Sequence, residues 1–172
     1  MRHFTMIRQL LTVLITTLAL ASCGFHLRSD KALPSNTDYL LVQASSQSAL
    51  LVRALEKRMT VYRIDGGSSA DPAKQASTIT IQLEPEQLNR RLLSVFATGQ
   101  VAEYELIYGV RYTVVFPDGE ALKTSFEVLR EYQDDPDQVL AKSRELNLVL
   151  SEMRLEAADR IIRLLSSQYA GK

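Results

Sequence analysis

The stretch VAEYELIYGVRYTVVF, residues 101–116, and the segment that follows it decide the fold. From Ala102 to Phe116 every even-numbered residue is apolar or aromatic, whereas several odd-numbered residues are charged or polar. Strict two-residue alternation is typical of a strand with one buried face. The tyrosines also match helical spacing, but the many β-branched and aromatic side chains favour a strand. We therefore expect a long, half-buried strand here.

Alternation resumes after the Pro117-Asp118-Gly119 turn, and it fixes the register of a hairpin. The apolar positions of residues 122–128 are again even-numbered. Opposed residues share a face, so even-numbered residues must pair with even-numbered residues. A two-residue loop would break this rule, but a three-residue loop over 117–119 with a left-handed Gly119 satisfies it. The expected pairs are Tyr112 with Thr124, Val110 with Phe126, Tyr108 with Val128, and Tyr104 with Tyr132.

Four further elements surround this hairpin. A short strand is expected over residues 39–43, a helix through Leu50 to Met59, and a strand over residues 79–83. Asp135 is a suitable N-cap, Pro136 suits a first helical position and Gln138 has the spacing of a capping box. A long apolar stripe predicts that this last helix runs from Pro136 to about Ser166; its members are Val139, Leu146, Val149, Leu150, Met153, Ala157, Ile161 and Leu164. Residues 65–76 have turn chemistry and are expected to be a mobile loop.

The order β-α-β-β-β-α predicts an α+β fold. Two helices and a sheet that each have one apolar face can bury these faces only by packing them against one another. We expect a two-layer α/β sandwich, with two helices on one face of a four-stranded, largely antiparallel or mixed sheet.

The N-terminus predicts export and a lipid anchor. Arg2 and Arg8 precede an apolar run over residues 10–21, which is too short to cross a bilayer as a helix. Leu20-Ala21-Ser22-Cys23 resembles the bacterial lipobox, whose cysteine is acylated; an ordinary signal peptide with a coincidental cysteine is the alternative. Gly24, rather than aspartate, after the cysteine resembles an outer-membrane sorting signal. We expect a signal peptide over 1–22, a lipidated lead-in over 23–37 and a single domain over 38–172.

Composition excludes several classes of protein. Removal of residues 1–22 leaves 150 residues, enough for one core, with 18 basic against 20 acidic residues once Arg2 and Arg8 are lost. This balance argues against a nucleic-acid-binding protein. Cys23 is the only cysteine and His26 the only histidine left, so an intrachain disulfide and a cysteine- or histidine-rich metal site are excluded.

Acidic residues offer weak candidates for catalysis. Glu103 and Glu105 share a strand face at roughly 7 Å, but they lie among other charged residues, so a solvated face is the favoured interpretation and a hydrolase the weaker one. Asp134, Asp135 and Asp137 do not have EF-hand spacing, and helix capping explains Asp135. We expect no catalytic residues, no cofactor and no metal.

Basic residues are better candidates for a binding site. Arg90 and Arg91 precede the strand-like residues 92–96. Lys142 lies at the edge of the apolar stripe of the last helix, where its stem can cover apolar surface while its ammonium reaches water. Ordinary boundary residues of an amphipathic helix are the alternative interpretation.

Three motifs resemble one family. Residues 23–28 (CGFHLR), residues 94–96 (SVF) followed by 99–104 (GQVAEY), and Asp135-Pro136 followed by Leu140-Ala141-Lys142 and Glu145 are similar, in this order, to segments of the lipopolysaccharide (LPS)-assembly lipoprotein LptE family. The resemblance extends from Cys23 to the last helix.

The resemblance implies a non-enzymatic role. Such proteins sit inside the outer-membrane β-barrel LptD and help to place LPS in the outer leaflet. A basic residue just after Val-Phe and the lysine of Leu-Ala-Lys are associated with LPS contact in the family. Lys142 matches the lysine, but Ala97 stands at the other position, where Arg90 or Arg91 could compensate. The alternative is a stand-alone outer-membrane lipoprotein that binds periplasmic proteins or envelope polymer without a barrel partner.

Overall fold

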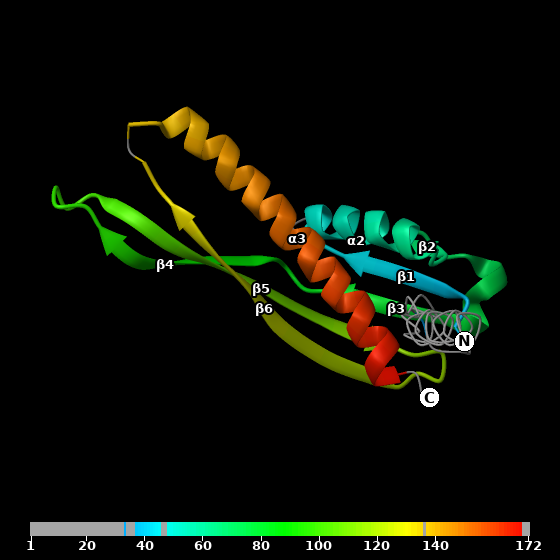
Figure 1. Cartoon of the computed structure of the whole chain (residues 1–172). Helices are drawn as coiled ribbons and strands as arrows, with labels where there is room; N and C mark the ends of the chain where they lie inside the picture. The colour runs from blue at the N-terminus through cyan, green and yellow to red at the C-terminus, as the bar shows by residue number, and fades with distance from the viewer. Residues whose placement is uncertain (1–32, 34–36, 46–47, 136, 170–172) are drawn as a thin grey trace, which may run out of the picture. The chain divides into compact units, whose positions relative to one another are not determined.

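The computed structural model describes Leu33 and residues 37–45, 48–135 and 137–169 (Figure 1). The elements in chain order are β1 (Tyr39–Ala44), α2 (Ala49–Tyr62), β2 (Gly66–Gly67), the 3-10 helix η2 (Pro72–Ser77), β3 (Thr78–Leu83), β4 (Gln87–Val95), β5 (Val101–Val115), β6 (Ala121–Gln133) and α3 (Val139–Tyr169). All of them belong to one compact unit, Lys31–Lys172. Figure 1 shows α2 and α3 on the same side of the sheet.

The sheet is mixed and has six strands, not the expected four. Its order is β2-β1-β3-β5-β4, and β6 also pairs with β5. β1 pairs in parallel with β2 and β3, whereas β5 pairs antiparallel with β3, β4 and β6. β3 and β4 lie one after the other along the same side of β5, with Glu84-Pro85-Glu86 between them. The α+β class with a mixed sheet is confirmed, and the strand count is corrected by β4 and the very short β2.

The predicted register of the β5–β6 hairpin is confirmed. Tyr112 pairs with Thr124, and the ladder continues without interruption to Tyr104 opposite Tyr132. The Phe116 N–H donates to the Glu120 carbonyl at 2.9 Å, so the loop has three residues. Gly119 has a φ of 86°, the left-handed conformation that this loop requires.

The core lies between the helices and one face of the sheet, to which β1, β5 and β6 contribute even-numbered side chains and β3 contributes odd-numbered ones. Leu106 and Val114 of β5 are fully buried, as are Leu55 of α2 and Met153 and Ile161 of α3. Only the start of α3 extends beyond this core: Val139, expected in the buried stripe, is 63% exposed. Leu146, Val149 and Leu150 are partly buried and pack against the core, so the stripe is shorter than predicted at its first turn only.

Helix α3 begins at Val139, later than the predicted Pro136, and it ends at Tyr169 rather than near Ser166. The Asp135 carboxylate accepts a hydrogen bond from the Asp137 N–H at 3.0 Å and another from the Gln138 side-chain amide at 2.8 Å. These bonds form a turn before the helix. The hydrogen bonds expected of a helix cap therefore stabilise a turn that precedes the helix.

The segment 65–76, expected to be a loop, contains β2 and η2. A Cβ atom at Gly66 would lie 2.1 Å from the Leu40 carbonyl oxygen, so only glycine allows this close pairing with β1. The Asp71 carboxylate accepts the Ala73 N–H at 3.0 Å and caps η2. Local hydrogen bonding thus gives this segment regular structure.

Glu86 joins both helices to the connection between β3 and β4. Its Oε1 accepts the Leu51 N–H at 3.1 Å, in the first turn of α2, where backbone N–H groups lack partners within the helix. Its Oε2 accepts the Arg154 Nε–H of α3 at 2.9 Å. Both ionic side chains are largely buried, with 12% of Glu86 and 18% of Arg154 exposed. This carboxylate therefore positions α2 and α3 relative to the sheet.

We predict that Glu86→Gln lowers the free energy of unfolding of the full chain by about 2 kcal/mol, because it leaves the largely buried Arg154 without an anionic partner. Glu84→Gln is the matched control: Glu84 pairs with Arg111, but both side chains are about half exposed, so the loss should be at most about 0.5 kcal/mol. Urea denaturation of both variants measures the difference. Equal losses would show that Glu86 has no special role.

Candidate functional site

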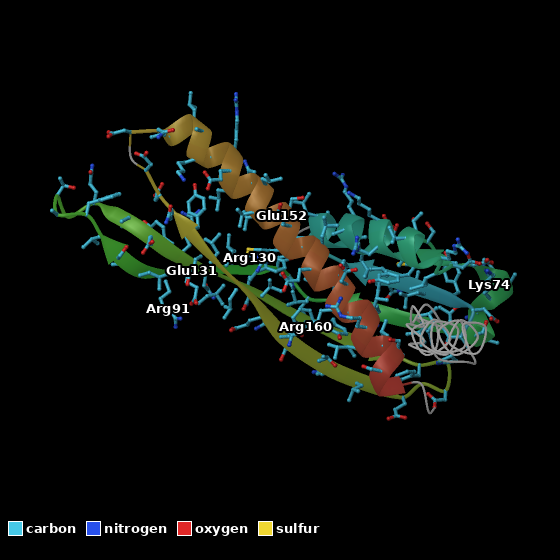
Figure 2. All side chains as sticks on the ribbon, viewed as in Figure 1. Lys74, Arg91, Arg130, Glu131, Glu152 and Arg160 are labelled. Atoms are coloured by element: carbon cyan, nitrogen blue, oxygen red, sulfur yellow. The ribbon has the colours of Figure 1, made fainter. Side chains whose placement is uncertain are left out.

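The structure brings Arg90 and Lys142 together and separates Arg91 from them. Arg90 lies in β4 opposite Leu106, whose side chain is buried beneath the helices. Arg91 lies opposite Glu105. Because successive residues of a strand point to opposite faces, Arg90 is on the face that carries the helices and Arg91 is on the other face. Figure 2 shows Arg91 on the side of the sheet away from α3.

Two opposed tyrosines hold the cations of this site. Tyr104 of β5 and Tyr132 of β6 are directly paired, so their rings are neighbours on the helix-bearing face. The Arg90 guanidinium carbon lies 5.9 Å from the centre of the Tyr104 ring. The Lys142 Nζ lies 5.5 Å from the centre of the Tyr132 ring. Cations at this distance are attracted to the ring faces, so both are held at the same pair of aromatic side chains.

Lys142 is also fixed by hydrogen bonds. The Tyr132 hydroxyl donates to the Lys142 carbonyl oxygen at 2.7 Å and ties the start of α3 to β6. The Lys142 Nζ donates to Glu145 Oε2 at 2.9 Å, and this bond raises the pKa of the ammonium above its usual value. Burial raises the pKa of the Tyr132 hydroxyl, while Lys142 and Arg90 act in the opposite direction. Lys142 therefore stays protonated and presents a fixed positive charge.

Arg91 is neutralised on the opposite face. Its guanidinium forms an ion pair with Glu105, of which only 15% of the side chain is exposed. Arg90, by contrast, makes no ion pair with the residues that the structure describes. Of the two arginines considered as possible compensation for Ala97, only Arg90 shares a site with Lys142.

Ala97 lies at the tip of the β4–β5 hairpin. The Phe96 N–H donates to the Gln100 carbonyl at 2.8 Å, and Gly99 has a φ of 85°. The side chain of Ala97 is exposed and uncharged. The tip therefore offers no positive charge to an anionic ligand at this position.

The carboxylates considered for catalysis have structural partners. Glu103 accepts the Ser94 hydroxyl at 2.8 Å, and Glu105 is paired with Arg91. Each glutamate thus has its own structural partner, and the two carboxylates do not act as a pair. Among the described residues no group of three or more histidine, cysteine, aspartate or glutamate side chains could hold a metal ion.

The predicted lipidation site Cys23, together with His26, the signal peptide and most of the lead-in, lies outside the described residues. In the part of the chain that is described, no helix is both long enough and apolar enough to span a bilayer.

Comparison with known proteins decides the family. The LptE family model, described as lipopolysaccharide-assembly, matches residues 37–165, which cover every strand and most of α3. The chain belongs to this family. The resemblance found in the sequence motifs is thereby confirmed.

Relatives of the LptE family match over nearly the whole chain. The LPS-assembly lipoprotein LptE of Pectobacterium atrosepticum is 31% identical over 167 residues, which cover 96% of this chain and 86% of that protein. The protein of the same name from Photorhabdus laumondii is 31% identical over 170 residues, with 96% and 87% covered. The crystal structure of the rare lipoprotein B from Shewanella oneidensis is 37% identical, with a TM-score of 0.63, and covers 76% of this chain and 95% of that one.

The LptE motifs pointed to Lys142, but the sequence did not separate Arg90 from Arg91. It also gave no role to Tyr104 and Tyr132, although their pairing followed from the predicted register. A strand over residues 87–95 would have placed Arg90 on the face of the paired tyrosines, so the missing information was the extent of β4.

Proposed function

We propose that this chain is an outer-membrane lipoprotein subunit of the LPS translocon, which plugs and helps to assemble an LptD-like β-barrel and assists LPS insertion into the outer leaflet. Membership of the LptE family supports this role, as do relatives named LPS-assembly lipoproteins. The single structural observation that carries the proposal is the pair of cations, Arg90 and Lys142, held on the opposed Tyr104 and Tyr132. The role is non-enzymatic.

The uncovered face of the sheet is suited to a polar barrel lumen. It carries the Arg91–Glu105 and Arg111–Glu84 ion pairs together with exposed charged residues of β6, namely Lys123, Glu127 and Glu131. The interior of an outer-membrane barrel is polar, so these side chains could remain solvated or find charged partners there. Both helices lie on the other face.

The cationic site is suited to the phosphates of LPS. Lipid A carries phosphate groups, and charge-assisted hydrogen bonds from lysine or arginine are among the strongest that proteins use. A phosphate could replace Glu145, whose side chain is 48% exposed, as the partner of Lys142. Arg90 would provide the second positive charge, which the family's basic residue after Val-Phe would supply and which Ala97 lacks.

The acylated Cys23 would hold the subunit at the inner leaflet of the outer membrane, facing the periplasm. Each buried CH₂ of an acyl chain contributes about 0.8 kcal/mol, so several chains anchor a protein almost irreversibly.

We predict that a C-terminally tagged chain, extracted from outer membranes in mild detergent, elutes with one large β-barrel protein in an equimolar amount. Identification of the eluted proteins by mass spectrometry and quantitative staining checks this. Elution of the lipoprotein alone, or with periplasmic proteins or envelope polymer only, would support the stand-alone alternative instead.

We predict that Lys142→Gln weakens LPS binding by the purified complex roughly tenfold, because a charge-assisted hydrogen bond to phosphate is lost. Lys74→Gln is the matched control, since Lys74 also pairs with a carboxylate (Asp65, 2.8 Å) and lies 5.6 Å from a tyrosine ring (Tyr39), but at the other end of the sheet (Figure 2). Titration with labelled LPS measures both affinities. An unchanged affinity in Lys142→Gln would remove Lys142 from the site.

A further inference from the structure

An apolar strip on β4 is left open on the face that elsewhere forms the core. Leu88 and Leu92 flank Arg90 on this strand and pair with Tyr108 and Tyr104 of β5. Their side chains therefore point to the same side as the buried core residues of β5. Yet Leu88 is 38% exposed and Leu92 is 54% exposed. The helix layer thus ends before it covers β4.

Helix α3 is held over β6 instead. Tyr132 of β6 bonds the Lys142 carbonyl, Arg130 pairs with Glu156 at 2.6 Å, and the Arg160 guanidinium donates to the Glu127 carbonyl at 3.2 Å. These three contacts lie along residues 127–132, in the half of β6 that pairs with the start of β5. They hold the helix away from the free edge of β4.

The side of α3 that faces β4 is also apolar. Arg154 reaches from α3 to Glu86, which immediately precedes β4. Leu150 lies one turn before Arg154, and Leu146 and Leu150 lie two turns before the buried Met153 and Ala157, so both leucines point toward the sheet. They are partly buried and pack against the edge of the core. We name the surface formed by Leu88, Arg90, Leu92, Leu146 and Leu150 the β4 shelf.

The β4 shelf combines apolar surface with positive charge. The Glu86–Arg154 ion pair lies at one end, and Lys142 lies at the other, two turns of α3 before Leu150. Arg90 lies between the two leucines of β4. A ligand that complements this surface has an anionic head group with hydrocarbon chains attached. A polar barrel lumen does not complement it.

We propose that the β4 shelf binds acyl chains of an LPS molecule whose lipid A phosphates are held by Arg90 and Lys142. This inference rests on the proposed function and assigns the hydrocarbon part of the ligand to β4. The leucines supply contact area that excludes water, and the two cations set which end of the lipid lies at Tyr132. Apolar side chains grouped on one surface are typical of ligand-binding grooves.

A photo-crosslinking amino acid at position 92 of the full chain, in growing cells, tests the proposal. The matched control is position 129: Leu129 is 48% exposed but pairs with Ile107, on the opposite face of the sheet. We expect an LPS adduct at position 92 that is several-fold stronger than at position 129. An adduct only with the barrel, only with a second copy of this chain, or with no partner would overturn the assignment.

A second measurement separates acyl-chain contact from phosphate contact. The purified complex is titrated with intact LPS and with the same LPS stripped of its acyl chains. Leu92→Asn should weaken binding of intact LPS roughly tenfold and leave binding of the stripped molecule unchanged, whereas Leu129→Asn should change neither. Equal effects of Leu92→Asn on both ligands, or none, would contradict the proposal. Co-elution of the barrel with the tagged chain tests the proposed function separately, so the two can fail independently.

Discussion

The structure depends on one constraint: the even-numbered residues of β5 must face the helices, and β6 must pair with β5 so that its own even-numbered residues do the same. The three-residue turn with a left-handed Gly119 satisfies this constraint. A slip of one residue would turn the apolar side chains of β6 toward water. The core and the cationic site both follow from this register, because both lie on the helix-bearing face of one hairpin.

The length of the hairpin separates these two regions. β5 spans Val101–Val115, and the core occupies the half that contains Leu106 to Val114. Tyr104 lies toward the other end, where α3 continues over β6 but does not cover β4. Glu86 helps to fix this arrangement, because its carboxylate binds α2 and α3 at the point where β3 gives way to β4. The site thus lies at the end of the core, where Tyr132 is still buried beneath α3 but β4 is not covered.

The sequence predicted those parts of the fold in which one hydrophobic pattern continued without interruption. The hairpin register followed from alternation, and the motifs pointed to the LptE family. Strand β4 was underestimated because it contains the polar run of residues 89–91 and register shifts between Leu92 and Val95, which break its alternation. Whether Arg90 or Arg91 faced the helices depended on that register. The start of α3 was misplaced because aspartate and proline suit a turn before a helix as well as its first residues.

The exposure of apolar residues on β4 and at the start of α3 could not be predicted from the sequence, for a different reason. Leu92 and Leu146 have the pattern of core residues, but burial depends on where a helix crosses a sheet. That crossing is set by long-range contacts such as Arg154 with Glu86 and Arg130 with Glu156. The same contacts leave apolar side chains of β4 exposed beside two cations, and this is the surface to which we assign the acyl chains.

Conditional depletion of the chain shows whether it serves LPS assembly in the cell. The measurement is the amount of newly made LPS that becomes accessible at the cell surface as the protein is lost. We expect surface LPS to fall and the outer membrane to become permeable as the chain is depleted, and we expect the intact chain supplied in trans to restore both. Normal delivery of LPS to the surface after complete depletion would contradict the proposed role in LPS assembly.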